Sequence, residues 1–462
     1  LAVGVSTAEA DPPPIQLLEL TGKATFTDDV RMSLHNKVAG HGNQVLNLAD
    51  PSGVVTAELR VQPGAMFPWQ SGSDGREESQ QVHLNPKSGR WNPDASWRQH
   101  HIGVAIAHNV WQYYQVTGDL GFLADYGAEM LVEIARFFAD IATYDHARDR
   151  YVIRGVIGPD EFHSGYPDAP FDGIDNNAYT NVMAVWVILR ALDALEIIPL
   201  RMRTELVDTL GLTARETARW EDVSRRMFVP FHDQVISQFE GYGDLAELDW
   251  EGYRRRHGDV QRLDRLLEAE GDDVNRYRAS KQADVLMLFY LLSADELREL
   301  FERLGYELTG ETIPRTIDYY MARTSHGSTL SAVVHSWVLA RAHRGQAMEF
   351  FDRVLASDIA DIQGGTTSEG IHLAAMAGSV DLLQRCFSGL EARGDRLVFG
   401  PQWPEELGVL AFPIFYRGHH LQVRISGRQV EVSAGAGIQR PIEIECRGRV
   451  ERLHPGDTVR ML

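Results

Sequence analysis

Apolar residues recur every three to four positions along much of the chain between residues 101 and 390. This spacing puts them on one face of a helix and therefore predicts α-helices. In the first such segment the apolar face holds Val104, Ala107, Trp111 and Tyr114, and Gly118 is a plausible stop. The predicted helices cover residues 101–116, about 120–144, 178–198, 281–292, 330–343, 347–356 and 370–390.

After Arg393 the apolar pattern changes from helical to alternating. Short alternating runs separated by Gly-containing turns are typical of antiparallel strands. They cover residues 397–399, 421–425, 430–432 and 442–446. Long helices separated by Gly-rich loops predict a mainly α fold, with antiparallel helix pairs that can close into an α/α toroid. The strands predict a small antiparallel β domain at the C-terminus.

The first 63 residues carry the weakest pattern. Consecutive prolines at positions 12–14 and several glycines interrupt any long helix. Only residues 54–61 alternate as a strand would. We therefore divide the chain into an unassigned segment 1–63, a helical barrel 64–393 and a C-terminal β domain 394–462.

Composition narrows the choice of partners and compartment. The formal net charge of −20 disfavours nucleic acid and anionic membranes, because both require basic patches. The two cysteines, Cys386 and Cys446, lack metal-ligand spacing, and so few cysteines suit a reducing compartment. No apolar run is long enough to span a bilayer, and the first residues do not resemble a signal peptide. We expect a cytoplasmic protein.

The stretch 155–163, Gly-Val-Ile-Gly-Pro-Asp-Glu-Phe-His, is unsuited to a helix because it holds two glycines and a proline. It places Glu161 beside Asp160 on an irregular backbone of the kind that holds a carboxylate over a cavity. Residues 175–181, Asp-Asn-Asn-Ala-Tyr-Thr-Asn, then begin a helix with three N-cap residue types. On composition alone, an ordinary surface turn is the favoured explanation of the first stretch.

Residues 64–78 and 280–284 hold side chains that suit a sugar. The first segment combines Phe67 and Trp69 with several charged residues, so aromatic rings could stack on a sugar while polar groups take its hydroxyls. A core Trp beside a surface turn is an equal alternative. In the second segment Lys281 and Gln282 open a helix, where they could reach a polyol or simply be solvated.

Residues 324–331 and 364–372 each place hydroxyls, glycine and a histidine directly ahead of a predicted helix. Backbone N–H groups at a helix start, together with such side chains, favour an anion site. Ser and Thr also cap helices without any ligand. Two such loops, combined with the acidic loop 155–163, favour an active site that binds an anion. Neither loop is a P-loop, because the Gly-Lys-Ser/Thr element is missing.

Four of these segments resemble motifs of glycoside hydrolase family 65: residues 155–163, 175–181, 281–285 (Lys-Gln-Ala-Asp-Val) and 364–372 (Gly-Gly-Thr-Thr-Ser-Glu-Gly-Ile-His). The resemblance extends from about residue 64 to the C-terminus. It implies an (α/α)6 barrel followed by a small β domain. The family includes maltose, trehalose, kojibiose and nigerose phosphorylases and some hydrolases, and its barrel is preceded by a large β-sandwich domain.

The resemblance also implies a reaction. Phosphate attacks the anomeric carbon of an α-glucosidic disaccharide with inversion, which releases β-glucose 1-phosphate and a free sugar. By motif matching, Glu161 is the general acid. The donor glucose would contact Lys281 and Gln282, the acceptor would lie near Trp69 and Gln70, and phosphate would be bound by His326, Ser328, Ser368 and His372. The implied partners are the disaccharide and phosphate, with no metal and no cofactor other than phosphate as co-substrate. Members of the family are often dimers, which implies a homodimer.

Two alternatives stay open: an inverting α-glucoside hydrolase of the same family, and a catalytically dead carbohydrate-binding remnant. An inverting hydrolase needs a second carboxylate about 6.5–9.5 Å from the acid. Glu369 is the visible candidate, but the phosphorylase motif contains it as well. Residues 1–63 lack the β-sandwich, the first barrel helices and the Phe-Trp-Asp motif that helps to hold the donor sugar. We therefore expect the barrel to be incomplete at its start, and the isolated chain to be poorly stable, inactive or dependent on association.

Overall fold

The computed structural model describes residues 46–50, 53–57, 63–73, 75, 77–340, 343–361, 367–404 and 407–462. All of them belong to one compact unit, Asn36–Leu462. The strand expected at residues 54–61 is described only as far as Ala57. There β2 (Gly53–Ala57) pairs antiparallel with β1 (Leu46–Asp50), and the rest of the predicted strand lies outside the described residues.

Helices dominate the chain between residues 101 and 386. They are α1 (His101–Thr117), α2 (Leu120–Phe122), α3 (Ala128–Ile141), α4 (Ala178–Ile197), α5 (Leu200–Leu210), α6 (Ala214–Arg226), α7 (Trp250–His257), α8 (Leu263–Glu270), α9 (Asp284–Leu291), α10 (Ala294–Arg303), α11 (Thr312–Met321), α12 (Thr329–Leu339), α13 (Arg344–Ala356) and α14 (Leu373–Asp381). Single turns of π-helix, Leu123–Gly127 and Leu382–Cys386, join α2 to α3 and extend α14.

The ends of these helices follow the signals in the sequence. Gly118 ends α1 with a positive φ of 67°, a conformation that glycine adopts without steric cost. The side chain of Asp119 then accepts a hydrogen bond from the backbone N–H of Phe122, as an N-cap does. Several expected ends were wrong: the helix predicted up to residue 144 stops at Ile141, with Tyr144 in β5, and the helix predicted over 330–343 stops at Leu339. The helix predicted over 370–390 begins at Leu373 and, with its turn of π-helix, ends at Cys386.

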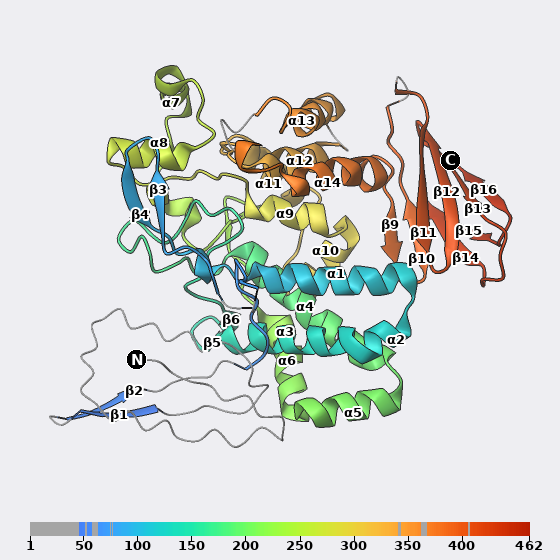
Figure 1. Ribbon diagram of the computed structural model, residues 1–462, viewed down its shortest axis with the longest axis horizontal. Coiled ribbons are helices and arrows are strands. Elements are labelled where there is room, and N and C mark those ends of the chain that lie inside the picture. The colour runs from blue at the N-terminus through green and yellow to red at the C-terminus, as the bar shows by residue number, and fades with distance from the viewer. Residues whose placement is uncertain are drawn as a thin grey trace. The chain divides into compact units, whose positions relative to one another are not determined.

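The helices pack in two layers (Figure 1). Helices α1, α4, α9, α12 and α14 pack against one another in chain order. Helices α3 and α6 cover α4, α10 packs on α9, and α13 packs on α12. This order of helix pairs confirms the predicted mainly α fold of the toroid type. No helix of the described residues is both long and apolar enough to cross a membrane.

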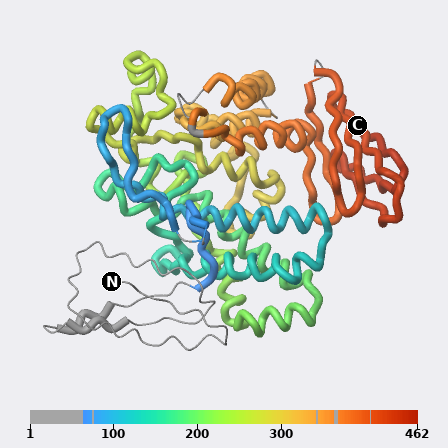
Figure 2. The backbone as a smooth tube through the Cα atoms, viewed as in Figure 1, coloured from blue at the N-terminus to red at the C-terminus, as the bar shows by residue number. Residues whose placement is uncertain are grey.

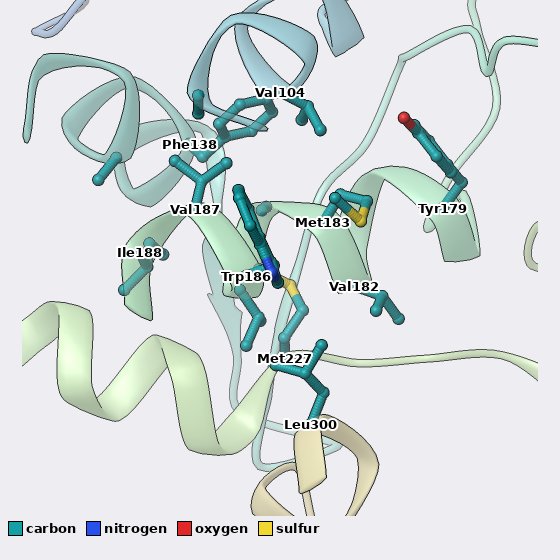
Figure 3. Packing of buried hydrophobic residues seen from close by; sticks show 14 of the residues in the cluster. Val104, Phe138, Tyr179, Val182, Met183, Trp186, Val187, Ile188, Met227 and Leu300 are labelled. Carbon is teal, nitrogen blue, oxygen red and sulfur yellow. The ribbon is translucent and has the colours of Figure 1, made fainter. Parts of the chain in front are cut away.

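Helix α4 forms the centre of the core (Figure 3). All of its residues from Ala178 to Ile188 are buried, which is typical of a helix enclosed by other helices. Trp186 is only 2% exposed and lies beside Met183, Val187 and Met227. Its indole N–H donates to the Oε1 of Glu296 at 2.8 Å, so the polar end of this buried side chain is satisfied.

The strands comprise small hairpins and two four-stranded sheets. The hairpins are β1 with β2, β3 (Val82–Asn85) with β4 (Arg90–Pro93), β5 (Thr143–Asp145) with β6 (Arg150–Val152), and β7 (Phe231–His232) with β8 (Val235–Ile236). The sheets contain β9 (Glu391–Arg393), β10 (Arg396–Phe399), β14 (Ile442–Cys446) and β15 (Arg449–Leu453), and β11 (Leu410–Tyr416), β12 (His419–Ser426), β13 (Gln429–Ala434) and β16 (Thr458–Met461). The hairpin β3–β4, blue in Figure 2, lies against α8, where the Nδ2 of Asn85 donates to the backbone oxygen of Arg265 at 2.9 Å.

The C-terminal β domain confirms the alternating pattern of the sequence. In β12 the residues Leu421, Val423 and Ile425 are buried, and the residues between them are exposed. The sheets are antiparallel except where β10 pairs parallel with β14, a pairing that short-range patterns do not reveal. The backbone N–H of Arg417 donates to the oxygen of Val116 at 2.7 Å, which joins the domain to the end of α1.

Candidate active site

The loop 155–163 is held in an unusual backbone conformation. Glu161 has a φ of 64°, in the left-handed region that a residue with a Cβ rarely occupies. Such strain persists only where the surroundings fix it, and it is commonest at functional sites. Gly158 explains part of the fit, because a Cβ there would lie 1.9 Å from the Oδ2 of Asp284. The glycine is needed for this close approach.

Glu161 and Lys281, 120 residues apart in the chain, form an ion pair. The Nζ of Lys281 lies 2.6 Å from the Oε2 of Glu161, and the two side chains are 19% and 31% exposed. Both line a cavity of about 560 Å³, and Trp69 and Gln70 lie on its wall as well. The structure therefore brings together four of the residues that the sequence predicted for the site.

Asp160 holds the Lys281 segment in place. Its Oδ1 accepts hydrogen bonds from the backbone N–H groups of Lys281 and Gln282, at 2.5 and 2.9 Å. Its Oδ2 accepts from the Nε2 of Gln238 at 2.9 Å. The side chain of Gln282 turns toward the same loop, where its Nε2 donates to the oxygen of Pro159 at 3.4 Å. These contacts also explain why the helix predicted from Lys281 begins at Asp284.

Asp284 lies behind Asp160 and is fully enclosed. It accepts hydrogen bonds from the backbone N–H of Asp160 at 2.6 Å and from the Nδ2 of Asn177 at 2.7 Å. Burial, together with the charge of Asp160, raises the pKa of Asp284 well above its usual value. Two adjacent carboxyl groups in a dry environment therefore form the base of the loop that carries Glu161.

The N-termini of the helices α1, α4 and α9 meet at this loop. Asn177 is the N-cap of α4, and its Oδ1 accepts from the backbone N–H of Thr180 at 2.9 Å. The ring of His101, at the start of α1, lies 5.2 Å from the ring of Trp69 and 6.4 Å from that of Tyr179. Since α9 also begins here, at Asp284, the loops that precede these helices share one end of the toroid.

The segment around His326 adjoins the Lys281 segment. The backbone N–H of Ser325 donates to the oxygen of Ser280 at 2.8 Å, and a Cβ at Gly327 would lie 3.2 Å from the Cγ of Lys281. His326 itself has a φ of 58°, and Ser328 is the N-cap of α12, where it accepts from the N–H of Leu330 at 3.2 Å. The predicted phosphate residues of this loop, His326 and Ser328, thus flank Gly327, which lies against the side chain of Lys281.

The other two predicted phosphate residues lie between α13 and α14. The Nδ1 of His372 is 2.6 Å from the Oδ1 of Asp358. The Oδ2 of Asp358 also accepts a hydrogen bond from the backbone N–H of His372, which fixes the connection between α13 and α14. Ser368 lies in the single 3-10 turn Thr367–Glu369. None of the described contacts joins Ser368 or His372 to Glu161, so their part in the site stays a prediction. Residues 362–366 and the side chain of Glu369 lie outside the described part of the chain.

Sequence reasoning missed Arg262 and Asp264, which line the cavity with Glu161. The Nη2 of Arg262 lies 2.7 Å from the Oδ2 of Asp264. Burial works to raise the pKa of Asp264, but the hydrogen bonds and charge of Arg262 hold it below its usual value. The pair lies at the start of the short helix α8, where the local sequence does not distinguish it from an ordinary charged pair on a helix. Within the described residues, no group of three or more His, Cys, Asp or Glu side chains is placed to hold a metal ion.

Comparison with known protein families shows to which family the chain belongs. The profile of the glycosyl hydrolase family 65 central catalytic domain matches residues 55–381. The chain belongs to glycosyl hydrolase family 65. The profile of the family 65 C-terminal domain matches residues 390–453, which contain the strands β9 to β15. The resemblance inferred from the four motifs is confirmed.

Several family 65 proteins are similar to this chain. An uncharacterised glycosyl hydrolase of Mycobacterium tuberculosis is 68% identical over 86% of this chain and 30% of that protein. The trehalose 6-phosphate phosphorylase of Lactococcus lactis is 36% identical over 83% of this chain and 48% of that protein. The kojibiose phosphorylase of Caldanaerobacter subterraneus is 32% identical, over 85% and 48%. The chain thus spans between about a third and a half of the length of these relatives.

A solved structure has a similar fold at low sequence identity. It belongs to a kojibiose phosphorylase-like protein from the human microbiome and gives a TM-score of 0.67 at 23% identity. The similarity covers 86% of this chain and 50% of that one. It supports the toroid and the C-terminal β domain as the family 65 fold.

Three partly buried histidines predict that the protein loses stability in mild acid. Burial lowers the pKa of His100, His101 and His108 to about 4, while an unfolded histidine titrates at about 6.5. Between these values the unfolded chain binds more protons than the folded one, so stability falls as the pH is lowered through this window. We expect the melting temperature to drop by several degrees between pH 7.5 and pH 5.5 at constant ionic strength.

A matched pair of variants tests this cause. His108→Gln removes one of the partly buried histidines, whose ring lies 5.7 Å from that of Trp186, whereas His146→Gln changes an exposed histidine. The first variant should shrink the pH dependence of the melting temperature, and the second should leave it unchanged. A melting temperature that stays constant or rises at pH 5.5 would contradict the prediction.

Proposed function

We propose that this chain carries out the inverting phosphorolysis of an α-glucosidic disaccharide to β-glucose 1-phosphate and a free sugar. Glu161 acts as the general acid, and inorganic phosphate is the nucleophile. The observation that carries the proposal is the arrangement of carboxylates around the cavity: Glu161 is paired with the cavity lysine Lys281, while most of the other carboxylates on the wall are committed to structural contacts.

Four of the five other carboxylates on the wall are poor candidates for the base of a hydrolase. The four are Asp94, bonded to His83 and Ser96; Asp264, bonded to Arg262; Glu268, bonded to Arg90 and Ser88; and Asp272, bonded to Tyr277 and Arg276. Burial works to raise the pKa of each, but the hydrogen bonds hold all four below their usual values. A base with a pKa far below the working pH is weak. Phosphate needs no such base, because it is already a nucleophile.

The proposed reaction assigns a task to each group. Glu161 gives its proton to the glycosidic oxygen as the bond to the anomeric carbon breaks, and a phosphate oxygen bonds to that carbon from the opposite face. Inversion converts the α-glucoside to a β-phosphate. Lys281 has to exchange the carboxylate for a hydroxyl of the donor sugar before Glu161 can carry its proton. Trp69 offers a stacking surface on the wall of the same cavity.

The proposed phosphate site is the loop before α12. Its residue Gly327 packs on Lys281, so an anion bound at His326 and Ser328 would be close to the donor sugar. Backbone N–H groups at the start of α12 favour an anion there. Ser368 and His372 would complete the site from the α13–α14 connection.

The disaccharide itself is suggested by the relatives. Two of them are named trehalose 6-phosphate phosphorylase and kojibiose phosphorylase. We therefore propose that trehalose, trehalose 6-phosphate, kojibiose, maltose and nigerose be compared as substrates. Each contains an α-linked glucose. They differ in the position at which the second glucose, which would face Trp69 and Gln70, is linked, and trehalose 6-phosphate also carries a phosphate.

The test is an assay of each sugar with and without inorganic phosphate, in which β-glucose 1-phosphate and free glucose are both measured. Phosphate-dependent formation of β-glucose 1-phosphate from one sugar is the expected result. Glucose release without phosphate would favour the hydrolase. Binding of a sugar without turnover under either condition would favour a carbohydrate-binding remnant.

A further inference from the structure

His326 is partly buried and contacts two buried polar side chains, Ser331 and His335, that the proposed reaction does not use. Its Nδ1 lies 2.9 Å from the Oγ of Ser331, one turn into α12. Its ring lies 4.6 Å from that of His335 and 5.2 Å from that of Phe350. Ser331 and His335 are completely buried. Ser331 and His335 therefore fix the orientation of the His326 ring through contacts on its Nδ1 side.

Only one assignment of donors and acceptors satisfies the hydrogen bonds among His335, Ser331 and His326. The Nδ1 of His335 lies 2.7 Å from the backbone oxygen of Ser331, and because a carbonyl only accepts, this nitrogen carries the hydrogen. The same nitrogen lies 3.2 Å from the Oγ of Ser331, which it can also reach as a donor. The hydroxyl of Ser331 then has its own hydrogen to give, and the Nδ1 of His326 is the acceptor within reach.

The opposite direction would leave a buried donor unsatisfied. If the Nδ1 of His326 donated to the Oγ of Ser331, the hydroxyl hydrogen of Ser331 would have no acceptor among the described residues, and burial without a partner is costly. Burial also lowers the pKa of His326 to about 2 and that of His335 to about 4, and the charges of Arg353 and Arg254 act on His326 in the same sense. Both rings are neutral at physiological pH.

We propose that Ser331 and His335 are positioning residues that hold His326 as the neutral tautomer with its hydrogen on Nε2. This rests on the proposed function, in which His326 binds phosphate. The Nε2 of His326 makes no hydrogen bond to a described residue, so its hydrogen is available to an oxygen of the anion. A neutral imidazole donates this hydrogen bond without giving up its proton.

The tautomer matters for the nucleophile. An imidazolium could transfer a proton to the phosphate dianion and make it a weaker nucleophile, whereas the neutral ring stabilises the dianion. The tautomer with its hydrogen on Nδ1 would direct the lone pair of Nε2 at the anion and repel it. Ser331 and His335 thus select the ring form that both binds phosphate and leaves it reactive.

A purely structural role for His335 is the competing explanation. Its Nε2 is buried and has no hydrogen-bond partner in the described part of the chain, which costs stability that an apolar side chain would avoid. The backbone oxygen of Ser331 can accept from the N–H of residue 335 within the helix, so it needs no imidazole. The stability of the fold alone therefore does not explain a histidine at this position.

Two substitutions of His335 separate these explanations. His335→Asn keeps an N–H donor near the place of Nδ1, and His335→Leu removes the donor at similar volume. We expect Leu to raise the KM for phosphate by about 5- to 10-fold, the effect of one lost hydrogen bond, with the KM for the disaccharide unchanged and the melting temperature unchanged or higher. Asn should restore most of the phosphate affinity. A lower melting temperature, with both KM values changed in parallel in the Leu variant, would overturn the proposal.

A direct measurement of the tautomer does not depend on turnover. In the chain labelled with ¹⁵N-histidine, the signal of His326 is the one lost in His326→Gln, and its two nitrogen shifts report which nitrogen carries the hydrogen. We expect the Nε2–H form in the wild type and a mixture of tautomers in Ser331→Ala. A charged ring or the Nδ1–H form in the wild type would overturn the proposal.

The same spectrum separates this inference from the proposed function. Inorganic phosphate should shift the Nε2 signal of His326 in the wild type, and more weakly in Ser331→Ala. If the expected tautomer is seen and phosphate binds, yet no sugar is turned over, then the proposed reaction fails and the positioning role stands. If phosphorolysis is observed but phosphate leaves the signal unchanged, the positioning role is overturned and the reaction stands.

Discussion

Replacement of Glu161 by Gln is expected to lower the rate of phosphate-dependent turnover by about 10²–10⁴-fold, the range that general acid catalysis contributes. The amide has the shape of the acid but cannot give a proton to the glycosidic oxygen. The ion pair with the Nζ of Lys281, now 2.6 Å from the carboxylate, is lost as well. The measurement is kcat for formation of β-glucose 1-phosphate from the sugar that the substrate panel selects.

The choice of leaving group makes this prediction specific. An aryl α-glucoside with an acidic phenol needs no proton from the enzyme as its bond breaks, so Glu161→Gln should lose far less rate on it than on a disaccharide. Affinity for the disaccharide and the melting temperature should stay close to the wild type. Equal losses on both substrates would show that the carboxyl group does something other than protonate the leaving oxygen.

Glu299→Gln is the matched control, because it removes the charge of an exposed glutamate on α10. It should leave kcat unchanged. If Glu161→Gln retains a rate similar to that of this control, Glu161 is not the general acid, and the site has to be sought elsewhere on the wall of the cavity.

Local sequence was enough to predict the elements that are determined by near neighbours. The buried helix α4 and its N-cap Asn177 follow from the periodic spacing of apolar residues and from the capping preference of Asn. The irregular loop around Glu161 follows from its glycines and proline. Surface helices such as α6 and α10 were missed, because each buries only three residues and its polar positions conceal the apolar stripe.

Contacts between distant segments could not be predicted in the same way. The hydrogen bonds from Lys281 and Gln282 to Asp160 join parts of the chain that are more than 100 residues apart. The sequence places Lys281 at the start of a helix, but the acceptor for its backbone N–H lies in another loop. For the same reason the cavity residues Arg262 and Asp264 were not identified, since their role depends on which segments the toroid brings together.

Replacement of Asp160 by Ala is expected to destabilise the protein and to abolish turnover, although Asp160 has no part in the proposed chemistry. Its carboxylate satisfies the backbone N–H groups of Lys281 and Gln282 and the amide of Gln238 in a place where water does not reach. Each buried donor left without a partner costs about 1–3 kcal/mol, so the free energy of unfolding should fall by about 3 kcal/mol or more. Urea unfolding followed by tryptophan fluorescence measures the difference.

Asp273→Ala is a control of the same chemistry. Asp273 also accepts a backbone hydrogen bond, from the N–H of Asn275 at 2.9 Å, but it caps a short 3-10 turn at the cavity. Loss of one cap costs about 1 kcal/mol. Asp160→Ala should therefore be the more damaging of the two variants. A loss equal to or smaller than that of Asp273→Ala would mean that other groups or water satisfy the Lys281 segment.

Asp160→Asn separates hydrogen bonding from charge. The Asn oxygen can still accept from Lys281 and Gln282, but its amide would face the amide of Gln238, whose oxygen already accepts from the N–H of Asp284 at 3.2 Å. This loss is partly offset, because removal of the Asp160 charge relieves the repulsion that helps to raise the pKa of Asp284. We expect a stability between those of the wild type and Asp160→Ala. If Asn were as damaging as Ala, the charge of Asp160, rather than its capacity to accept hydrogen bonds, would hold the Lys281 segment beside Glu161.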